Sequence, residues 1–120
     1  VTGYVEAVGM PGLEPEARWS VSLRGGRLIE VQPNSTTTST SLDRIHQIKI
    51  ATNDSGPWGA DVWWVFEGLA GAVLSAFPQG ATGEQDVMDW AMALPDFDYS
   101  AMTEAMSSVE NAEFVVWRKK

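Results

Sequence analysis

The stretch RWSVSLRGGRLIEVQ, residues 18–32, has the pattern of a β-hairpin. Its first half alternates polar residues with three apolar ones, the period-2 pattern of a strand with one buried face: Trp19, Val21 and Leu23. The pair Gly25-Gly26 supplies the positive φ angles that a tight hairpin turn requires, and residues 27–32 then return as a second strand. The chain is therefore expected to begin its fold with antiparallel strands.

Four more strands are predicted downstream, at residues 34–41, 47–52, 61–67 and 72–77. The first is a Ser/Thr run that suits an exposed strand, and residues 42–45 after it predict one helical turn. In the second, Ile48 and Ile50 are expected to face inward. The third is apolar at both parities, which predicts a strand that is covered on both faces.

The periodicity changes to that of helices after residue 81. Thr82 and Gln85 have capping-box spacing, and an apolar helix face follows at Val87, Met88, Ala91 and Leu94, before Pro95. A second helix is expected to begin at Asp98 or Ser100 and to end at Asn111, with an inner face of Met102, Ala105, Met106 and Val109. Residues 112–118 predict a terminal strand.

This order predicts an α+β fold, in which a bent antiparallel sheet or partial barrel carries two C-terminal helices followed by a final strand. Residues 18–120 are expected to form one domain, large enough for its own hydrophobic core. The segment 1–17, with its glycines and prolines, has no clear pattern and is left as a poorly defined N-terminal segment.

Charge is distributed unevenly along the chain. Its net charge is −8, and the residues between Lys49 and Arg118 include eleven carboxylates but no lysine or arginine. Such a field repels nucleic acid and anionic membranes and attracts cationic partners. We therefore expect no nucleic acid and no membrane as partners, and a cationic protein as the favoured class.

Other compositional features exclude whole classes of site. The chain has no cysteine, so disulfides, thiolate metal sites and cysteine nucleophiles are ruled out, and a cytoplasmic location is expected. No apolar run reaches the roughly 20 residues of a membrane-spanning helix. His46 is the only histidine and is expected at a surface or boundary position, so no histidine metal cluster is possible. No catalytic residue, metal site or cofactor is predicted.

Two loops contain the best candidates for a binding site. The segments 53–61 and 78–84 are rich in glycine and proline, and each joins an apolar strand to the next element. Loops on a rigid sheet are where binding groups concentrate, which makes the candidates Asn53, Asp54, Trp58, Asp61, Gln79 and Thr82. The alternative is that these glycines serve turns and these acids serve as caps, and the sequence leaves both interpretations open.

Several short motifs are familiar as a set. TNDSGP (52–57), DVWWV (61–65), FPQGATGE (77–84) and LPDFD (94–98) resemble those of a family of small uncharacterised bacterial proteins, over residues 18–118. That resemblance implies no activity. The strand order is also similar, more weakly, to pleckstrin-homology-like barrels, although no phosphoinositide site can be transferred to this chain.

The sequence favours a non-catalytic binding module. Its own surface is acidic, and its partner is a protein or a smaller ligand. Two alternatives are kept: an immunity or inhibitor protein for a basic toxin, acting by charge complementarity, and a small enzyme that uses Asp54 or Asp61 in a cleft lined by Trp58.

Overall fold

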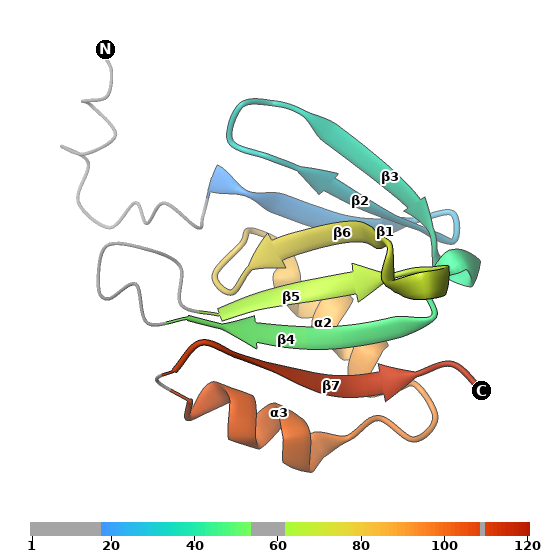
Figure 1. The fold of residues 1–120 in the computed structure, drawn as a ribbon. Helices are drawn as coiled ribbons and strands as arrows, with labels where there is room; N and C mark the ends of the chain where they lie inside the picture. The colour runs from blue at the N-terminus through green and yellow to red at the C-terminus, as the bar shows by residue number, and fades with distance from the viewer. Residues whose placement is uncertain (1–17, 54–61, 109) are drawn as a thin grey trace, which may run out of the picture.

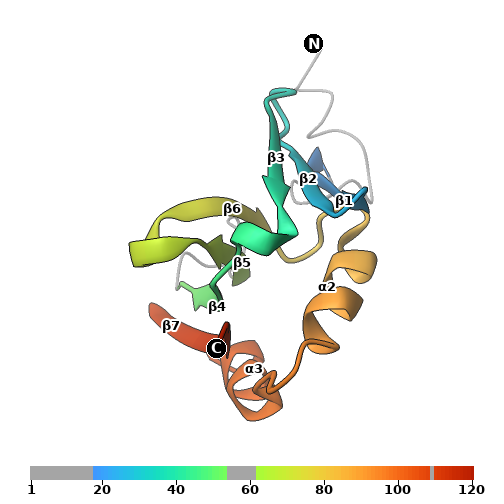
Figure 2. The same cartoon turned by 90° about the vertical axis from the view of Figure 1, so that its right-hand side faces the viewer.

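The structure is a computed structural model that describes residues 18–53, 62–108 and 110–120. In this part of the chain seven strands form two antiparallel sheets, with two α-helices on one side (Figures 1 and 2). Sheet A has the order β1-β2-β3, formed by Ser20–Arg24, Arg27–Val31 and Thr37–Ser41. Sheet B has the order β6-β5-β4-β7, formed by Val73–Pro78, Val62–Glu67, Gln47–Thr52 and Ala112–Arg118. The predicted α+β class and the final strand are confirmed, but the strands divide into two sheets and do not close a barrel.

Local patterns predicted the strands of the first half well. The hairpin β1–β2 turns at Gly25 and Gly26, which have φ angles of 55° and 75°. The Ser/Thr run forms β3, and a 3-10 helix at Leu42–Arg44 follows it as expected. Each of these elements is specified by neighbours in sequence, which is why single-sequence reasoning found them.

Strand β5 corrects the prediction of a strand covered on both faces. Trp64 and Phe66 are fully buried on its inner face, whereas Trp63 and Val65 are only half-buried on the other. The outer face of sheet B is therefore partly open, and the tryptophan pair Trp63-Trp64 divides between core and surface.

The start of helix α2 (Glu84–Met92) corrects the predicted capping box. The N-cap is Gly83 in the left-handed conformation, and no side chain caps the helix. Thr82 is held in extended backbone beside β1, because its N–H donates to Trp19 O (2.8 Å) and its carbonyl accepts from Val21 N (2.9 Å). A residue paired in this way to a strand leaves the helix to begin two positions later.

Helix α3 (Tyr99–Met106) begins as predicted and ends early. The carboxylate of Asp98 accepts from Ala101 N at 2.9 Å, an N-cap. The helix stops at Met106 rather than at Asn111, since the Ser107 hydroxyl bonds to the carbonyls of Thr103 and Glu104 and competes with the helical pattern.

The helices pack through most of the predicted positions. Three are fully buried (Val87, Ala91 and Ala105), and three are half-buried against the core (Met88, Leu94 and Met102). Met106 was predicted to pack and is instead 36% exposed, at the last residue of its helix. Val109 lies outside the described residues.

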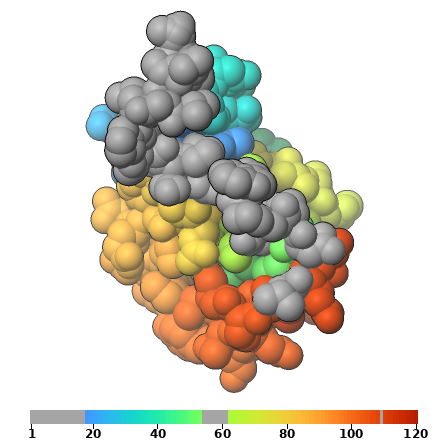
Figure 3. Space-filling view, turned by 90° about the vertical axis from the view of Figure 1, so that its left-hand side faces the viewer, coloured from blue at the N-terminus to red at the C-terminus, as the bar shows by residue number. Residues whose placement is uncertain are grey.

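One core fills the space between the sheets and the helices. Its largest members come from both sheets and both halves of the chain: Leu28, Ile45, Ile48, Ile50, Trp64, Phe66, Phe77, Val87 and Val116. In a view from one end, the orange and red segments form the lower part of the surface, and the blue and cyan atoms of sheet A are visible in the upper part (Figure 3). No helix in the described ranges is both long and apolar enough to cross a membrane.

Candidate functional site

Three of the six residues that the sequence nominated lie in the described part of the chain. Asn53 directly follows β4 and is half-buried, whereas Gln79 and Thr82 are exposed. The N–H of Gln79 donates to Val62 O at 2.8 Å, which places Gln79 beside the first residue of β5. Thr82 is paired with Ser20 of β1 instead. The other three candidates, Asp54, Trp58 and Asp61, lie outside the described residues.

The glycine-rich connection 78–84 serves a turn. The N–H of Gly80 donates to the carboxylate of Glu84 at 2.8 Å. This contact closes the connection between β6 and α2 on itself.

The two sheets meet along β6, which is one of the two edge strands of sheet B. Backbone groups on an outer strand need partners from elsewhere, and here sheet A provides side chains. The Thr40 hydroxyl of β3 donates to Leu74 O at 3.3 Å, and the Ala76 N–H donates to the Glu30 carboxylate of β2 at 3.1 Å. These contacts hold the sheets together without a continuous ladder of strand pairing.

A cleft of about 230 Å³ lies beside this junction, and we call it the inter-sheet cleft. Sheet A and β6 contribute polar groups to it, and two indoles stand at its wall. Trp19 and Trp63 pack edge to face, with ring centroids 5.3 Å apart. The lining is Trp19, Glu30, Gln32, Thr38, Trp63 and residues 73–76.

Glu30 is the distinctive group of the inter-sheet cleft because it is only 3% exposed. Its Oε1 accepts from Ser75 Oγ at 2.6 Å and from Ala76 N at 3.1 Å, and its Oε2 accepts from Gln32 Nε2 at 3.2 Å. A carboxylate offers about four acceptor positions, so one remains, on Oε2. Within the described ranges, no lysine or arginine forms an ion pair with it.

Strand alternation places Glu30 in this position. It has the parity of Leu28, which is fully buried, and it lies opposite Val21 and Thr38 in the sheet register. A buried carboxylate without a cation is costly unless it is hydrogen-bonded, and three neutral donors meet that need here. The arrangement keeps a carboxylate beside two aromatic rings, the chemistry that attracts a cationic head group.

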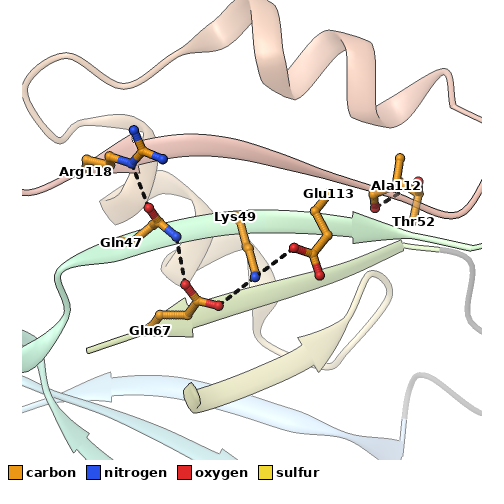
Figure 4. A network of polar contacts seen from close by, with 7 residues as sticks. All are labelled: Gln47, Lys49, Thr52, Glu67, Ala112, Glu113 and Arg118. Atoms are coloured by element: carbon orange, nitrogen blue, oxygen red, sulfur yellow. Dashed lines mark hydrogen bonds and ion pairs between the residues drawn. The ribbon is translucent and has the colours of Figure 1, made fainter. Parts of the chain in front are cut away.

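The outer face of sheet B carries a second polar group, a chain of contacts across three strands (Figure 4). Lys49 Nζ lies 2.7 Å from Glu67 Oε2 and 2.9 Å from Glu113 Oε1. Gln47 donates to the other oxygen of Glu67 at 2.7 Å and accepts from Arg118 Nε at 2.7 Å. The hydrogen bonds from Lys49 to Glu67, and then to Glu113, raise the pKa of its ammonium above 10.5.

The helical layer has a different electrostatic character from the rest of the surface. Neither helix contains a lysine or arginine, and their acids are the exposed Asp86, Asp89 and Glu104 and the half-buried Glu84. This surface continues through the exposed Asp96 and Asp98 between the helices. Asp96 is paired with Lys120 Nζ at 2.7 Å, so one base lies on this surface, which otherwise carries an excess of negative charge.

Sequence reasoning missed Trp19, Glu30, Gln32 and Trp63 as site residues. One signal was available, since Glu30 is an acid at an inward position of a predicted strand. Two of its hydrogen-bond partners, Ser75 and Ala76, belong to β6 and lie 45 and 46 positions away in the sequence. No local sequence pattern predicts a contact between residues so far apart in the chain. No group of three or more potential metal ligands lies together among the described side chains.

Comparison of the chain with protein-family models, with curated proteins and with solved structures gave no match.

Proposed function

We propose that this protein is a non-catalytic binding module that takes a cationic side chain of a protein partner into the inter-sheet cleft. The observation that carries the proposal is the Glu30 carboxylate, which is buried, held by three neutral donors, and unpaired with any described cation. A lysine or arginine head group would complete its hydrogen bonding at Oε2.

The walls of the cleft add to this preference. Indole is the best aromatic partner for a cation, and the attraction grows when the site is partly shielded from water. Trp19 and Trp63 are both half-buried, so their rings remain accessible beside the carboxylate. An anionic side chain would be repelled by the carboxylate, and a neutral one would lack the charge that strengthens both the aromatic contact and the hydrogen bond.

A more specific candidate is an inhibitor, of the immunity type, for a basic protein. It is favoured by the helical layer, where neither α2 nor α3 carries a base among its acids, although Lys120 pairs with Asp96 of their connection at 2.7 Å. Charge complementarity of this kind accelerates association and sets partner choice. In this version the helical layer steers the partner and the inter-sheet cleft holds one of its side chains.

The test compares two substitutions that remove the same charge. Glu30→Gln changes the cleft, whereas Glu104→Gln changes an exposed acid of α3. The probe is a short arginine-containing peptide, titrated by calorimetry at physiological salt. A hydrogen bond to a charged group contributes about 1.5–3 kcal/mol, so we expect Glu30→Gln to weaken binding at least about tenfold. Glu104→Gln should change it less than about twofold.

Equal losses in the two variants would mean that only the overall field attracts the peptide, and would refute the cleft. Absence of binding to the unaltered protein would refute it as well. Since Glu30 also holds Ser75 and Ala76, each variant is melted first. Trp63→Leu, which removes the aromatic wall and leaves Glu30 in place, provides an independent variant and should weaken binding too.

A further inference from the structure

A second cleft, of about 210 Å³, lies at the end of β5 that carries Glu67. It is formed where β4 begins, where β5 ends and where β7 ends, beside the 3-10 helix Leu69–Gly71. We call it the C-terminal cleft. Its lining is His46, Gln47, Glu67, Gly68, Leu69, Ala70, Gly71, Arg118 and Lys119.

The lining of the C-terminal cleft contains two bases and one acid, although the protein as a whole has a net charge of −8. Glu67 is the only acid in its lining, and that carboxylate is already paired with Lys49 at 2.7 Å and bonded by Gln47 at 2.7 Å. The two lining cations, Arg118 and Lys119, then have no acid of the lining left to neutralise them.

Both cations are held by neutral groups. Arg118 Nε donates to the amide oxygen of Gln47 at 2.7 Å, and Lys119 Nζ donates to the backbone carbonyl of Asp43 at 2.8 Å. Neither forms an ion pair within the described part of a chain that has sixteen acids and eight bases. Their side chains are therefore positioned while their charges stay available.

Pairing between distant strands brings further basic groups to this end. Gln47 pairs with Arg118 in the β4–β7 register, and the Lys119 N–H donates to His46 O at 2.8 Å. Arg44 belongs to the 3-10 helix that directly precedes this segment. The side-chain contacts join Arg118 and Lys119 to residues 71 and 76 positions away in the sequence.

We propose that the C-terminal cleft binds the oxyanion group of a small carboxylate or phosphate ligand, independently of the inter-sheet cleft. Arginine has five N–H donors, of which Nε uses one here, so the two Nη groups keep a fork that matches carboxylate and phosphate geometry. Lysine has three donors, of which Lys119 uses one in the described contacts.

Two other lining groups complete the site. His46 also lines the cleft, and an imidazole carries at least one N–H donor. Leu69, 73% exposed, gives an apolar rim for the body of the ligand. A single cleft of this size suits one anionic group and not the row of phosphates of a nucleic acid.

The test again uses a pair of variants with equal charge. Arg118→Gln removes the fork from the cleft, whereas Arg24→Gln removes an exposed arginine at the β1–β2 turn, outside its lining. Inorganic phosphate and acetate are titrated separately, at constant ionic strength, and the resonances of His46 and Arg118 are followed by NMR. We expect saturable shifts at these two residues with a Kd in the millimolar range, about 1–10 mM.

Arg118→Gln should weaken binding at least about tenfold, and Arg24→Gln should leave it within about twofold. Tighter binding of one probe would identify phosphate or carboxylate as the natural group. Equal weakening by both variants, or no saturable shift with either anion, would overturn the proposal. The melting temperature of Arg118→Gln is measured alongside, and Arg118→Lys, which keeps the charge but not the fork, should bind with intermediate affinity.

Discussion

Replacing Lys49 with methionine tests the polar network on sheet B. The substitution keeps an unbranched chain over the sheet and removes the cation that Glu67 contacts at 2.7 Å. The Glu67 side chain is only 4% exposed and would keep one described partner, the amide of Gln47. Removing one member of a buried pair costs about 3–5 kcal/mol, because the remaining charge is left uncompensated.

The Lys49 side chain is 17% exposed, so water can reach the vacated position and we reduce the expected loss to about 2–3 kcal/mol. Glu113→Gln removes the other partner of the same lysine, but that carboxylate is 62% exposed, and its loss should cost less than about 1 kcal/mol. The double variant Lys49→Met/Glu67→Gln should recover most of the loss, since it leaves no buried charge.

Urea unfolding of the four proteins gives the free energies, and equal m-values license their comparison. The reasoning fails if Lys49→Met costs less than about 0.5 kcal/mol, or no more than Glu113→Gln, because Glu67 would then be stable without its cation.

Three further predictions concern turns, helix packing and pH. Gly83→Ala should destabilise the protein by more than about 2 kcal/mol, because the new Cβ would lie 2.3 Å from a carbonyl oxygen of β1 and φ at this position is +85°. Gly71→Ala should cost only about 1 kcal/mol, because φ is +77° there but the space around it is open. Thermal melts that rank the two variants in reverse would contradict this. Met102 packs against the core and Met106 is exposed, so Met102→Ala should lower the free energy of unfolding by about 1–2 kcal/mol and Met106→Ala by less than about 0.5 kcal/mol. Urea titrations measure both values, and equal losses would show that Met106 also packs. The pKa of Lys49 is raised on folding, so the stability that its charge contributes is complete below pH 10.5 and is lost as the pH rises through the pKa of the folded state. When the free energy of unfolding is measured at increasing pH, it should therefore fall less in Lys49→Met than in the unaltered protein.

The sequence predicted the elements better than their arrangement. Alternation and the glycine pair located the β1–β2 hairpin, and apolar spacing located the inner faces of both helices, since these signals lie within a few residues. Helix ends were less accurate. The backbone of Thr82 is hydrogen-bonded to β1, and the Ser107 hydroxyl donates to carbonyls of α3. At the start of α2 and at the end of α3, a hydrogen bond therefore competes with the helical pattern.

The division into two sheets and the composition of the clefts depend on distant contacts. Glu30 reaches Ser75 across 45 positions, and Arg118 reaches Gln47 across 71. Hydrophobic alternation does not specify which strands are neighbours in a sheet, so neither of these two side-chain contacts could be inferred from the pattern. The parity of Glu30 was the one local sign that an acid is buried.

The most direct test of cation binding in the inter-sheet cleft is an NMR titration with ethylguanidinium chloride, which follows the indole N–H resonances and uses sodium chloride as the control. Cation binding in the cleft should give saturable shifts for Trp19 and Trp63, which line it. It should give none for Trp64, in the core, or Trp117, whose N–H is bonded to Pro95 O at 3.0 Å. Glu30→Gln should abolish those two shifts. Unchanged Trp19 and Trp63 resonances, or shifts that persist in Glu30→Gln, would contradict it.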